Sequence, residues 1–260
     1  MDTSCFINAL RRFIAICGPA KQIRSDRGTN FIGACRELDI PSNLDETKVT
    51  RFLADQGCSW IFNPPHASHM GGVWERMIGI TWKILDSMML QLRSSRITHE
   101  VLTTFMAEVT TIINSRPLVP VIMDPEDPLI LTPSALLTLK YGPCPCPSGE
   151  FDHADLYRKQ WKQVQNLAST FWDRWRKQYL STLQPRKKWQ VKRQDITEGS
   201  VVLMKDHQSK RNQWPLGRIT RVFPSEDGRV RKVEIKVMDK EESKVFIRPV
   251  TEVVILIPSD

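Results

Sequence analysis

The hydrophobic period of this chain changes from helical to strand-like between Leu183 and Ile196, and that change limits what the C-terminal part can fold into. From Asp152 to Leu183, apolar residues recur every three or four positions, which predicts one long amphipathic helix. From Ile196 onward, short apolar segments alternate with polar residues and turns, which is typical of strands. Four or five short strands in roughly 60 residues favour a small β-barrel of the SH3-like kind. The predicted strands are 201–204, 217–223, 230–237 and 253–257.

The N-terminal half mixes helical and strand patterns, so we expect an α/β fold there. Thr132 and Pro133 have the residue types of a helix cap and a first helical position. The Pro/Gly-rich stretch 141–149 indicates a domain boundary. We therefore predict three parts, at residues 1–140, 141–195 and 196–260. The expected helices are 4–16, 44–56, 73–92 and 98–114, and the expected strands are 22–25 and 59–62.

The basic charge is concentrated in the C-terminal part. Residues 1–150 carry 14 Lys/Arg against 15 Asp/Glu, whereas residues 151–260 carry 23 against 14. Such an excess favours a partner with phosphates, although a solvated basic surface is the simpler alternative. No apolar run approaches the ~18 residues of a membrane span, so we expect no membrane partner. No signal peptide precedes the six scattered cysteines, so we expect reduced thiols in an intracellular protein.

Two acidic residues stand at positions suited to metal chemistry. Asp26 follows a short apolar segment at a glycine-containing turn, and Glu75 stands near the start of a long amphipathic helix. Carboxylates on rigid elements can hold the divalent ions that catalyse phosphoryl transfer. Each also has a structural alternative. Asp26 can bond its own turn backbone, and Glu75 can be a charge favoured by the helix dipole.

Several segments in a fixed order resemble the integrases of BEL/Pao-type LTR retrotransposons. These segments are Phe6–Phe13, Ser25–Ala34, Asn63–Arg76, Asn114–Leu118 and Leu131–Pro133, followed by 171–175, 214–219 and 248–250. The joint presence of several motifs in order makes the resemblance specific. It implies a retroviral-type catalytic core with an RNase H-like fold, a basic C-terminal domain, and three acidic residues that bind metal. Asp26 then corresponds to the second acid and Glu75 to the third.

The resemblance also implies a reaction and its partners. Members are polynucleotidyl transferases that use Mg²⁺ (or Mn²⁺) to join the element's DNA ends to target DNA, as nuclear homo-oligomers. Both metal-binding and catalytic roles are expected at Asp26 and Glu75. The expected first acid would lie on a strand upstream of the first helix, where this sequence has none. We therefore expect an N-terminally truncated core that is inactive alone, with a catalytically dead or domesticated DNA-binding protein as the alternative. A third hypothesis is an interaction module that assembles through the helix at 152–183.

Further residues are candidates for contact with DNA. Asn30, Ser68, His69, Arg76 and Lys83 lie close in sequence to the two acids or on the same helix as Glu75. In the C-terminal part, the candidates are Arg218, Arg221, Arg231 and Lys232, with the aromatic residues Trp214 and Phe223 near them in sequence. Their structural alternatives are a turn residue for Asn30, a solvated helix charge for Lys83 and ordinary strand-surface charge for the C-terminal group. We expect the tryptophans at 161–175 to pack inside the fold rather than to stack on bases.

Overall fold

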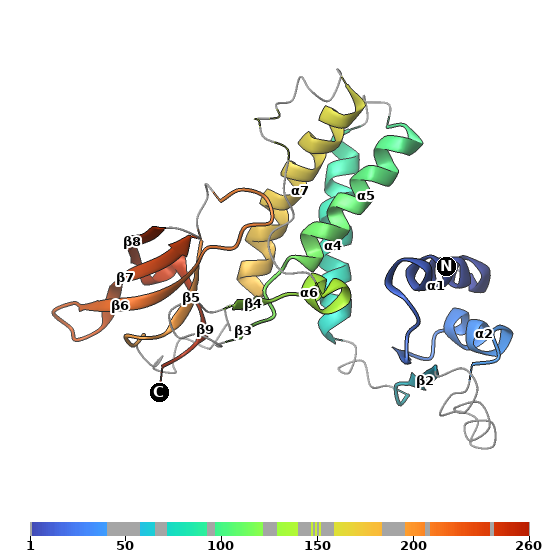
Figure 1. The fold of residues 1–260 in the computed structure, drawn as a ribbon, viewed down its shortest axis with the longest axis horizontal. Helices are drawn as coiled ribbons and strands as arrows, with labels where there is room; N and C mark the ends of the chain where they lie inside the picture. The colour runs from blue at the N-terminus through green and yellow to red at the C-terminus, as the bar shows by residue number, and fades with distance from the viewer. Residues whose placement is uncertain are drawn as a thin grey trace. The chain divides into compact units, whose positions relative to one another are not determined.

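The computed structural model is a mixed α/β protein (Figure 1). It describes residues 2–40, 58–65, 72–92, 97–121, 129–139, 147, 149, 151, 159–183, 196–205, 209–239 and 242–259. Its contacts divide the chain into two compact units, Met1–Trp82 and Lys83–Asp260. The domain boundaries expected near residues 140 and 195 stay predictions. No described helix is both long and apolar enough to cross a membrane.

The first unit is built on a pair of parallel strands. The strand β1 (Gln22–Ser25) pairs with β2 (Ser59–Phe62), and the helices α1 (Thr3–Cys17) and α2 (Thr29–Glu37) lie in the same unit. Trp60 and Phe62 are buried and stacked, with ring centroids 5.5 Å apart. Phe6 of α1 and Phe31 of α2 pack around them. Since both strands carry apolar side chains toward this aromatic cluster, burial of these rings holds the unit together.

In the second unit, the helix α5 (His99–Asn114) packs along α7 (Gln160–Leu183) (Figure 1). The end of α4 (Gly72–Gln91), which begins in the first unit, is hydrogen-bonded to α7. Phe105 of α5 meets Phe171 of α7 edge to face at 6.4 Å. Arg174 of α7 donates hydrogen bonds to the side chains of Ser87 and Gln91 on α4, at 3.0 and 2.6 Å. The short elements β3 (Val119–Val121), β4 (Leu129–Leu131) and α6 (Pro133–Thr138) follow α5 in sequence.

Two of the three tryptophans of α7 are packing residues, as expected, whereas Trp161 is 51% exposed. Trp172 and Trp175 are buried, and Trp214 meets Trp172 edge to face at 5.0 Å. Their indole N–H groups have no hydrogen-bond partner in the described part of the chain. Tyr179, also on α7, donates a 2.6 Å hydrogen bond to the carbonyl of Pro117. Burial raises the pKa of Tyr179 to about 12, against a smaller opposite effect of Arg116.

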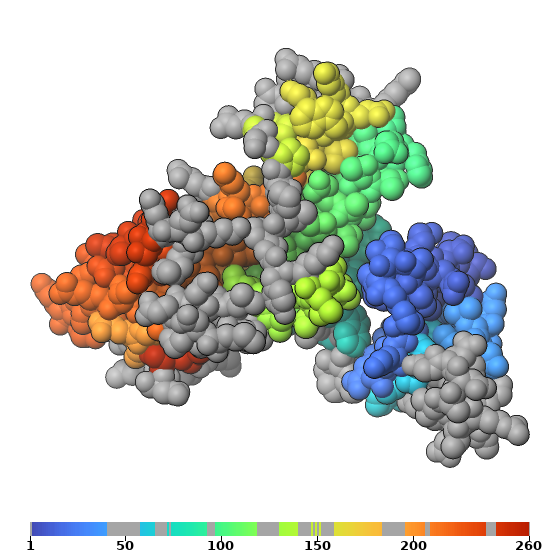
Figure 2. Space-filling view, viewed as in Figure 1, coloured from blue at the N-terminus to red at the C-terminus, as the bar shows by residue number. Residues whose placement is uncertain are grey.

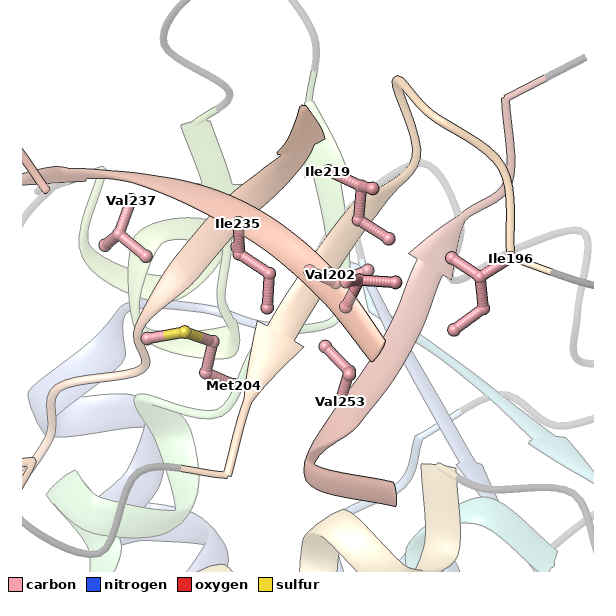
Figure 3. Packing of buried hydrophobic residues seen from close by; sticks show 8 residues of the cluster. Ile196, Val202, Met204, Ile219, Ile235, Val237 and Val253 are labelled. Atoms are coloured by element: carbon pink, nitrogen blue, oxygen red, sulfur yellow. The ribbon is translucent and has the colours of Figure 1, made fainter. Parts of the chain in front are cut away.

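The C-terminal part is a five-stranded antiparallel sheet with the strand order β8-β7-β6-β5-β9. Its inner face carries one apolar cluster, in which Val202, Ile219 and Ile235 point toward one another (Figure 3). Gly217 lies where β6 packs closely against its antiparallel partner β7. Glycine is required at this position because a Cβ would lie 2.9 Å from the carbonyl oxygen of Lys236. The strands are β5 (Val201–Met204), β6 (Leu216–Pro224), β7 (Val230–Asp239), β8 (Glu242–Pro249) and β9 (Val253–Ile257), with the 3-10 turn η3 (Val250–Glu252) before β9.

Most elements lie where the sequence patterns predicted them, and the exceptions include α2, the short strands β3 and β4, and β8. The segment after Asp26, expected as a turn, continues into α2, and β8 was not predicted as a strand. The long helix begins at Gln160, and residues 152–158 of the predicted helix lie outside the described residues. The predicted helix at 44–56 lies outside them as well. The helical spacing of Trp74, Ile78, Leu85 and Met88 predicts one apolar face on α4. Leu85 and Met88 are buried, whereas Trp74 and Ile78 are 41% and 53% exposed.

Candidate metal centre and nucleic-acid interface

Asp26 directly follows the carboxyl end of β1, and the neighbouring residues fix its backbone. The hydroxyl of Ser25 accepts a hydrogen bond from the buried indole N–H of Trp60 at 2.9 Å. On the other side, the guanidinium of Arg27 donates to the carbonyl oxygen of Asn63 at 3.2 Å. Asp26 is thus held between two bonds to the β2 segment while its own carboxylate remains exposed. The carboxyl ends of parallel strands are the usual place for functional side chains in α/β folds.

Two side-chain oxygens converge above Gly28. If Gly28 carried a Cβ, that atom would lie 2.9 Å from Oδ1 of Asn30 and 3.1 Å from Oδ1 of Asp26. Asp26 Oδ1 also accepts a 2.9 Å hydrogen bond from the backbone N–H of Gly28. Asn30 lies in the first turn of α2, so this helix brings its amide back toward Asp26. Glycine at position 28 therefore allows a carboxylate oxygen and an amide oxygen to lie close together.

Glu75, Arg76 and Lys83 are all exposed on α4, and Glu75 lies in its first turn. Among the described residues, no hydrogen bond or ion pair joins Asp26 to Glu75. Nor does that part of the chain hold a group of three or more His, Cys, Asp or Glu side chains able to bind a metal ion. Ser68 and His69 lie outside the described residues. The structure therefore gives the local setting of each acid, and their joint role stays a prediction.

Three of the four C-terminal candidates share the outer face of the sheet, opposite the apolar cluster. Ile219 and Val233 point into that cluster, so Arg218 and Lys232, one position before each in the chain, point away from it. A register shift between Ile219 and Arg221 turns Arg221 to the same outer face, opposite Glu234. Such a register shift is a β-bulge, which strand alternation alone does not predict. The bulge places Arg221 on the same face as Arg218 and Lys232.

Phe223 and two cations form the centre of this outer face. The guanidinium carbon of Arg221 lies 5.3 Å from the ring centroid of Phe223, and the ammonium of Lys232 lies 5.0 Å from it. Phe223 and Lys232 are direct partners in the β6–β7 register. Such cation–π contacts orient long, flexible side chains and keep their charge at the surface. Figure 2 shows the orange-to-red surface of the β6–β7 hairpin uncovered at its turn end.

The other candidates of this region have different surroundings. Arg231 is adjacent to Lys232 but forms a 2.6 Å ion pair with Asp227 of the β6–β7 turn. Arg218 has a buried Nε atom with no hydrogen-bond partner in the residues described. Trp214, expected among the basic residues, instead packs on α7. The contact surface that the structure assembles is therefore Arg221, Phe223 and Lys232, which we call the cationic face.

Sequence reasoning missed a buried polar contact that attaches the 209–214 loop to the helices. The Arg211 guanidinium donates to the side-chain and backbone oxygens of Gln165 on α7. It also lies 3.6 Å from a carboxylate oxygen of Glu108 on α5. Arg211 and Gln165 are both buried. Contacts between residues this far apart in sequence leave no periodic signal, so no pattern in the chain indicates them.

The C-terminal part of the chain is similar to a known protein family. Residues 159–256 match the model of a family of unknown function (DUF5641). No curated protein matches the chain. The matched segment begins next to the first residue of α7 and ends in β9. The helix and the sheet therefore recur together, which agrees with the packing of Trp172 on Trp214.

Proposed function

We propose that this chain is a retrotransposon-type integrase fragment that binds DNA through its C-terminal sheet. The observation that carries the proposal is the cationic face, in which Arg221 and Lys232 flank Phe223 on one side of the sheet. On this proposal the five strands form an SH3-like barrel, and the β1–β2 pair with its helices is part of an RNase H-like core. The partners are the DNA ends of the element and target DNA in the nucleus, bound by a homo-oligomer.

Binding by the cationic face would be through phosphates. Arg221 and Lys232 are both exposed, and within the described residues neither side chain forms an ion pair with a carboxylate. Lysine and arginine that neutralise phosphates release counterions, and this release supplies affinity without reading sequence. The net positive charge of residues 151–260 adds long-range attraction to the same partner.

The metal chemistry of the proposal belongs to Asp26 and Glu75. Mg²⁺ and Mn²⁺ prefer hard oxygen ligands, and Asp26 offers a carboxylate that is exposed and held on a fixed backbone. Asn30 supplies a further oxygen on the same side of Gly28. A metal bound there would polarise a phosphodiester and stabilise the leaving oxygen. The residues present fit hard divalent ions, and Glu75 is the second carboxylate that the proposal requires.

A second candidate is a DNA-binding protein without catalysis. The bond from the N–H of Gly28 to Asp26 Oδ1 favours it, because this is the hydrogen bond of an aspartate that stabilises its own turn. On that view, Asp26 is retained for the geometry between β1 and α2. The cationic face has the same role in both candidates.

Two measurements on the full chain test these candidates. In the first, duplex DNA affinity is compared between the wild type, the Arg221→Ala/Lys232→Ala variant and an Arg229→Ala/Arg231→Ala control with the same charge loss. We expect a loss of about tenfold or more for the first variant only, because two phosphate contacts are removed. Equal losses in both variants would refute a role for this face.

The second measurement is Mg²⁺-dependent strand transfer with labelled duplex ends. Product formation that is lost in both Asp26→Asn and Glu75→Gln supports the metal-dependent reaction. DNA binding that is unchanged by these substitutions, with no product under any condition, supports the second candidate. Because both variants keep the size of the side chain, thermal unfolding curves should match those of the wild type.

A further inference from the structure

The outermost strand of the sheet, β8, combines an open edge with exposed apolar side chains. It is the end strand in the order β8-β7-β6-β5-β9, and among the described residues only β7 pairs with it. Val245 is 57% exposed and Ile247 is 51% exposed. At the opposite end of the sheet, β9 has β3 beside it. An edge strand directs alternate N–H and C=O groups away from its sheet, so it is a template for one more strand.

The two faces of β8 differ in chemistry. Val245 and Ile247 pair in register with Lys236 and Glu234, so they lie on the outer face of the sheet. Lys244 and Arg248 pair with Val237 and Val233, so they lie on the inner-face side. An added strand would therefore meet aliphatic side chains on one face and two cations on the other.

We propose that β8 binds an extended acidic peptide segment of a partner protein by strand addition. The register fixes the pattern of that segment over five residues: acidic, apolar, any residue, apolar, acidic. The acidic positions face Lys244 and Arg248, and the apolar positions face Val245 and Ile247. The pattern reads the same in both directions, so it fits a parallel or an antiparallel addition.

Charge complementarity favours this occupant over a second copy of the chain. In an antiparallel self-pairing that places Val245 opposite Ile247, Lys244 faces Arg248 of the other copy, and like charges directly opposite one another oppose pairing. Edge lysines also discourage association with neutral apolar strands. Lys244 and Arg248, which repel a second copy of β8, would attract an acidic strand. Attraction to one partner combined with repulsion of another is a common basis of specificity.

The side chains of β8 also distinguish this surface from the cationic face. Nucleic acids are bound through cations on phosphates and aromatic rings on bases. Val245 and Ile247 offer neither, and their β-branched side chains suit the pleated surface of a neighbouring strand. Arg248 already lies against its own strand, with its Nη1 donating to the carbonyl of Ile247 at 3.2 Å and its guanidinium 5.3 Å from the Phe246 ring. This contact holds the charge beside the edge, where an incoming carboxylate would meet it.

The test measures binding of fluorescein-labelled peptides to the full chain by fluorescence anisotropy. One peptide carries the acidic pattern with Glu at its two ends, and a second carries Lys in place of both Glu residues. We expect the wild type to prefer the acidic peptide by about tenfold or more, and the Lys244→Glu/Arg248→Glu variant to invert that preference. N-methylation of the peptide backbone on its pairing edge should abolish binding.

A matched control separates local pairing from general attraction. The Arg229→Glu/Arg231→Glu variant makes the same change of charge at the exposed turn end of the β6–β7 hairpin, outside the β7–β8 register, which begins at Lys232 and Pro249. Loss of the acidic peptide to the same extent in this control overturns the proposal. So does equal binding of the N-methylated peptide. Circular dichroism and melting curves of each variant establish that the sheet is folded.

Two other occupants would show themselves in the same experiments. A wild-type dimer in light scattering that becomes a monomer in Val245→Lys would mean that a second copy covers β8. Displacement of the peptide by duplex DNA, with loss of DNA binding in the β8 reversal variant, would mean that β8 belongs to the nucleic-acid surface. Either result overturns the proposal, and neither bears on the role of Arg221 and Lys232 in DNA binding.

Discussion

Gly217 shows how strongly a single residue can be fixed by close packing in this sheet. A methyl group at this position would lie 2.9 Å from the carbonyl oxygen of Lys236 and 3.1 Å from a methyl carbon of Val237. Since one neighbour is backbone, the strand itself would have to shift. We expect Gly217→Ala to lower the free energy of unfolding by about 1–3 kcal/mol, measured by urea denaturation.

The matched substitution is Gly79→Ala on α4. Gly79 is helical, and a Cβ there would meet nothing within 4 Å. Alanine should therefore stabilise the chain by about 0.5–1 kcal/mol, because it restricts the unfolded chain and favours helix. If the two Gly→Ala substitutions change the free energy of unfolding in opposite directions, the effect of close packing at Gly217 is separated from that of helix propensity at Gly79. A stabilising Gly217→Ala would contradict the packing of β6 on β7.

Tyr179 makes the stability of the chain depend on alkaline pH. Burial raises its pKa to about 12 in the folded state, whereas an unfolded tyrosine titrates near pH 10. Above about pH 10 the unfolded state loses the proton first, so the free energy of unfolding falls as the pH rises toward 12. Below about pH 10 this contribution is fully present.

The Tyr179→Phe variant isolates that contribution. At neutral pH it should be less stable than the wild type by about 1–2 kcal/mol, because the carbonyl of Pro117 loses its 2.6 Å hydrogen bond. Toward alkaline pH the wild type loses stability and the variant lacks the group responsible, so the gap should narrow. Denaturant unfolding at several pH values measures this, and a gap that stays constant up to pH ~11.5 would count against the raised pKa.

At the scale of elements, Arg211 joins α5, α7 and the loop before β6. Its guanidinium is bonded to Gln165 and lies 3.6 Å from Glu108, and both Arg211 and Gln165 are buried. Arg211→Ala removes the guanidinium from the buried oxygens of Gln165 and from the carboxylate of Glu108, so we expect a loss of about 2–4 kcal/mol in denaturant unfolding. Arg231→Ala removes an exposed ion pair with Asp227 and should change stability by no more than about 0.5 kcal/mol.

The elements also show which physical signals the sequence carries. Thr98 and Thr132 accept hydrogen bonds from Val101 and Ala135 at the predicted helix starts, because caps are local and depend on residue type. The helix α2 was missed because its cap residue, Gly28, makes no side-chain bond and only Ala34 and Cys35 are buried on it. The sequence of α2 therefore shows neither a capping side chain nor a long apolar stripe, which are the two local signals of a helix.

The strand β8 and the cationic face were missed or only partly predicted for a different reason. In β8 the exposed outer positions hold the apolar residues Val245 and Ile247, and the inner-face side holds Lys244 and Arg248, so the strand lacks the usual alternation of buried apolar and exposed polar residues. Grouping of Arg221 with Lys232 depends on a register shift in β6, which is a property of strand pairing. Asp26 was found because a carboxylate after a short strand is a local pattern, whereas Asn30 approaches it only through α2.

At the scale of the whole molecule, charge is distributed unevenly along the chain, and this should appear in how DNA binding responds to salt. Residues 151–260 hold the entire basic excess, and the cationic face lies within them. If Arg221 and Lys232 each neutralise one phosphate, their joint replacement by alanine should reduce the slope of log affinity against log salt by about 2.

The same prediction distinguishes a localised contact from diffuse attraction. Diffuse attraction depends on net charge. The Arg229→Ala/Arg231→Ala variant has the same net charge as the Arg221→Ala/Lys232→Ala variant, so diffuse attraction would reduce the salt slope equally in both. A local contact leaves the slope of this control close to that of the wild type, because Arg231 already pairs with Asp227. Titrations from low to physiological salt with one duplex measure both slopes. Affinity that does not change with salt in the wild type would rule out a phosphate-based interface altogether.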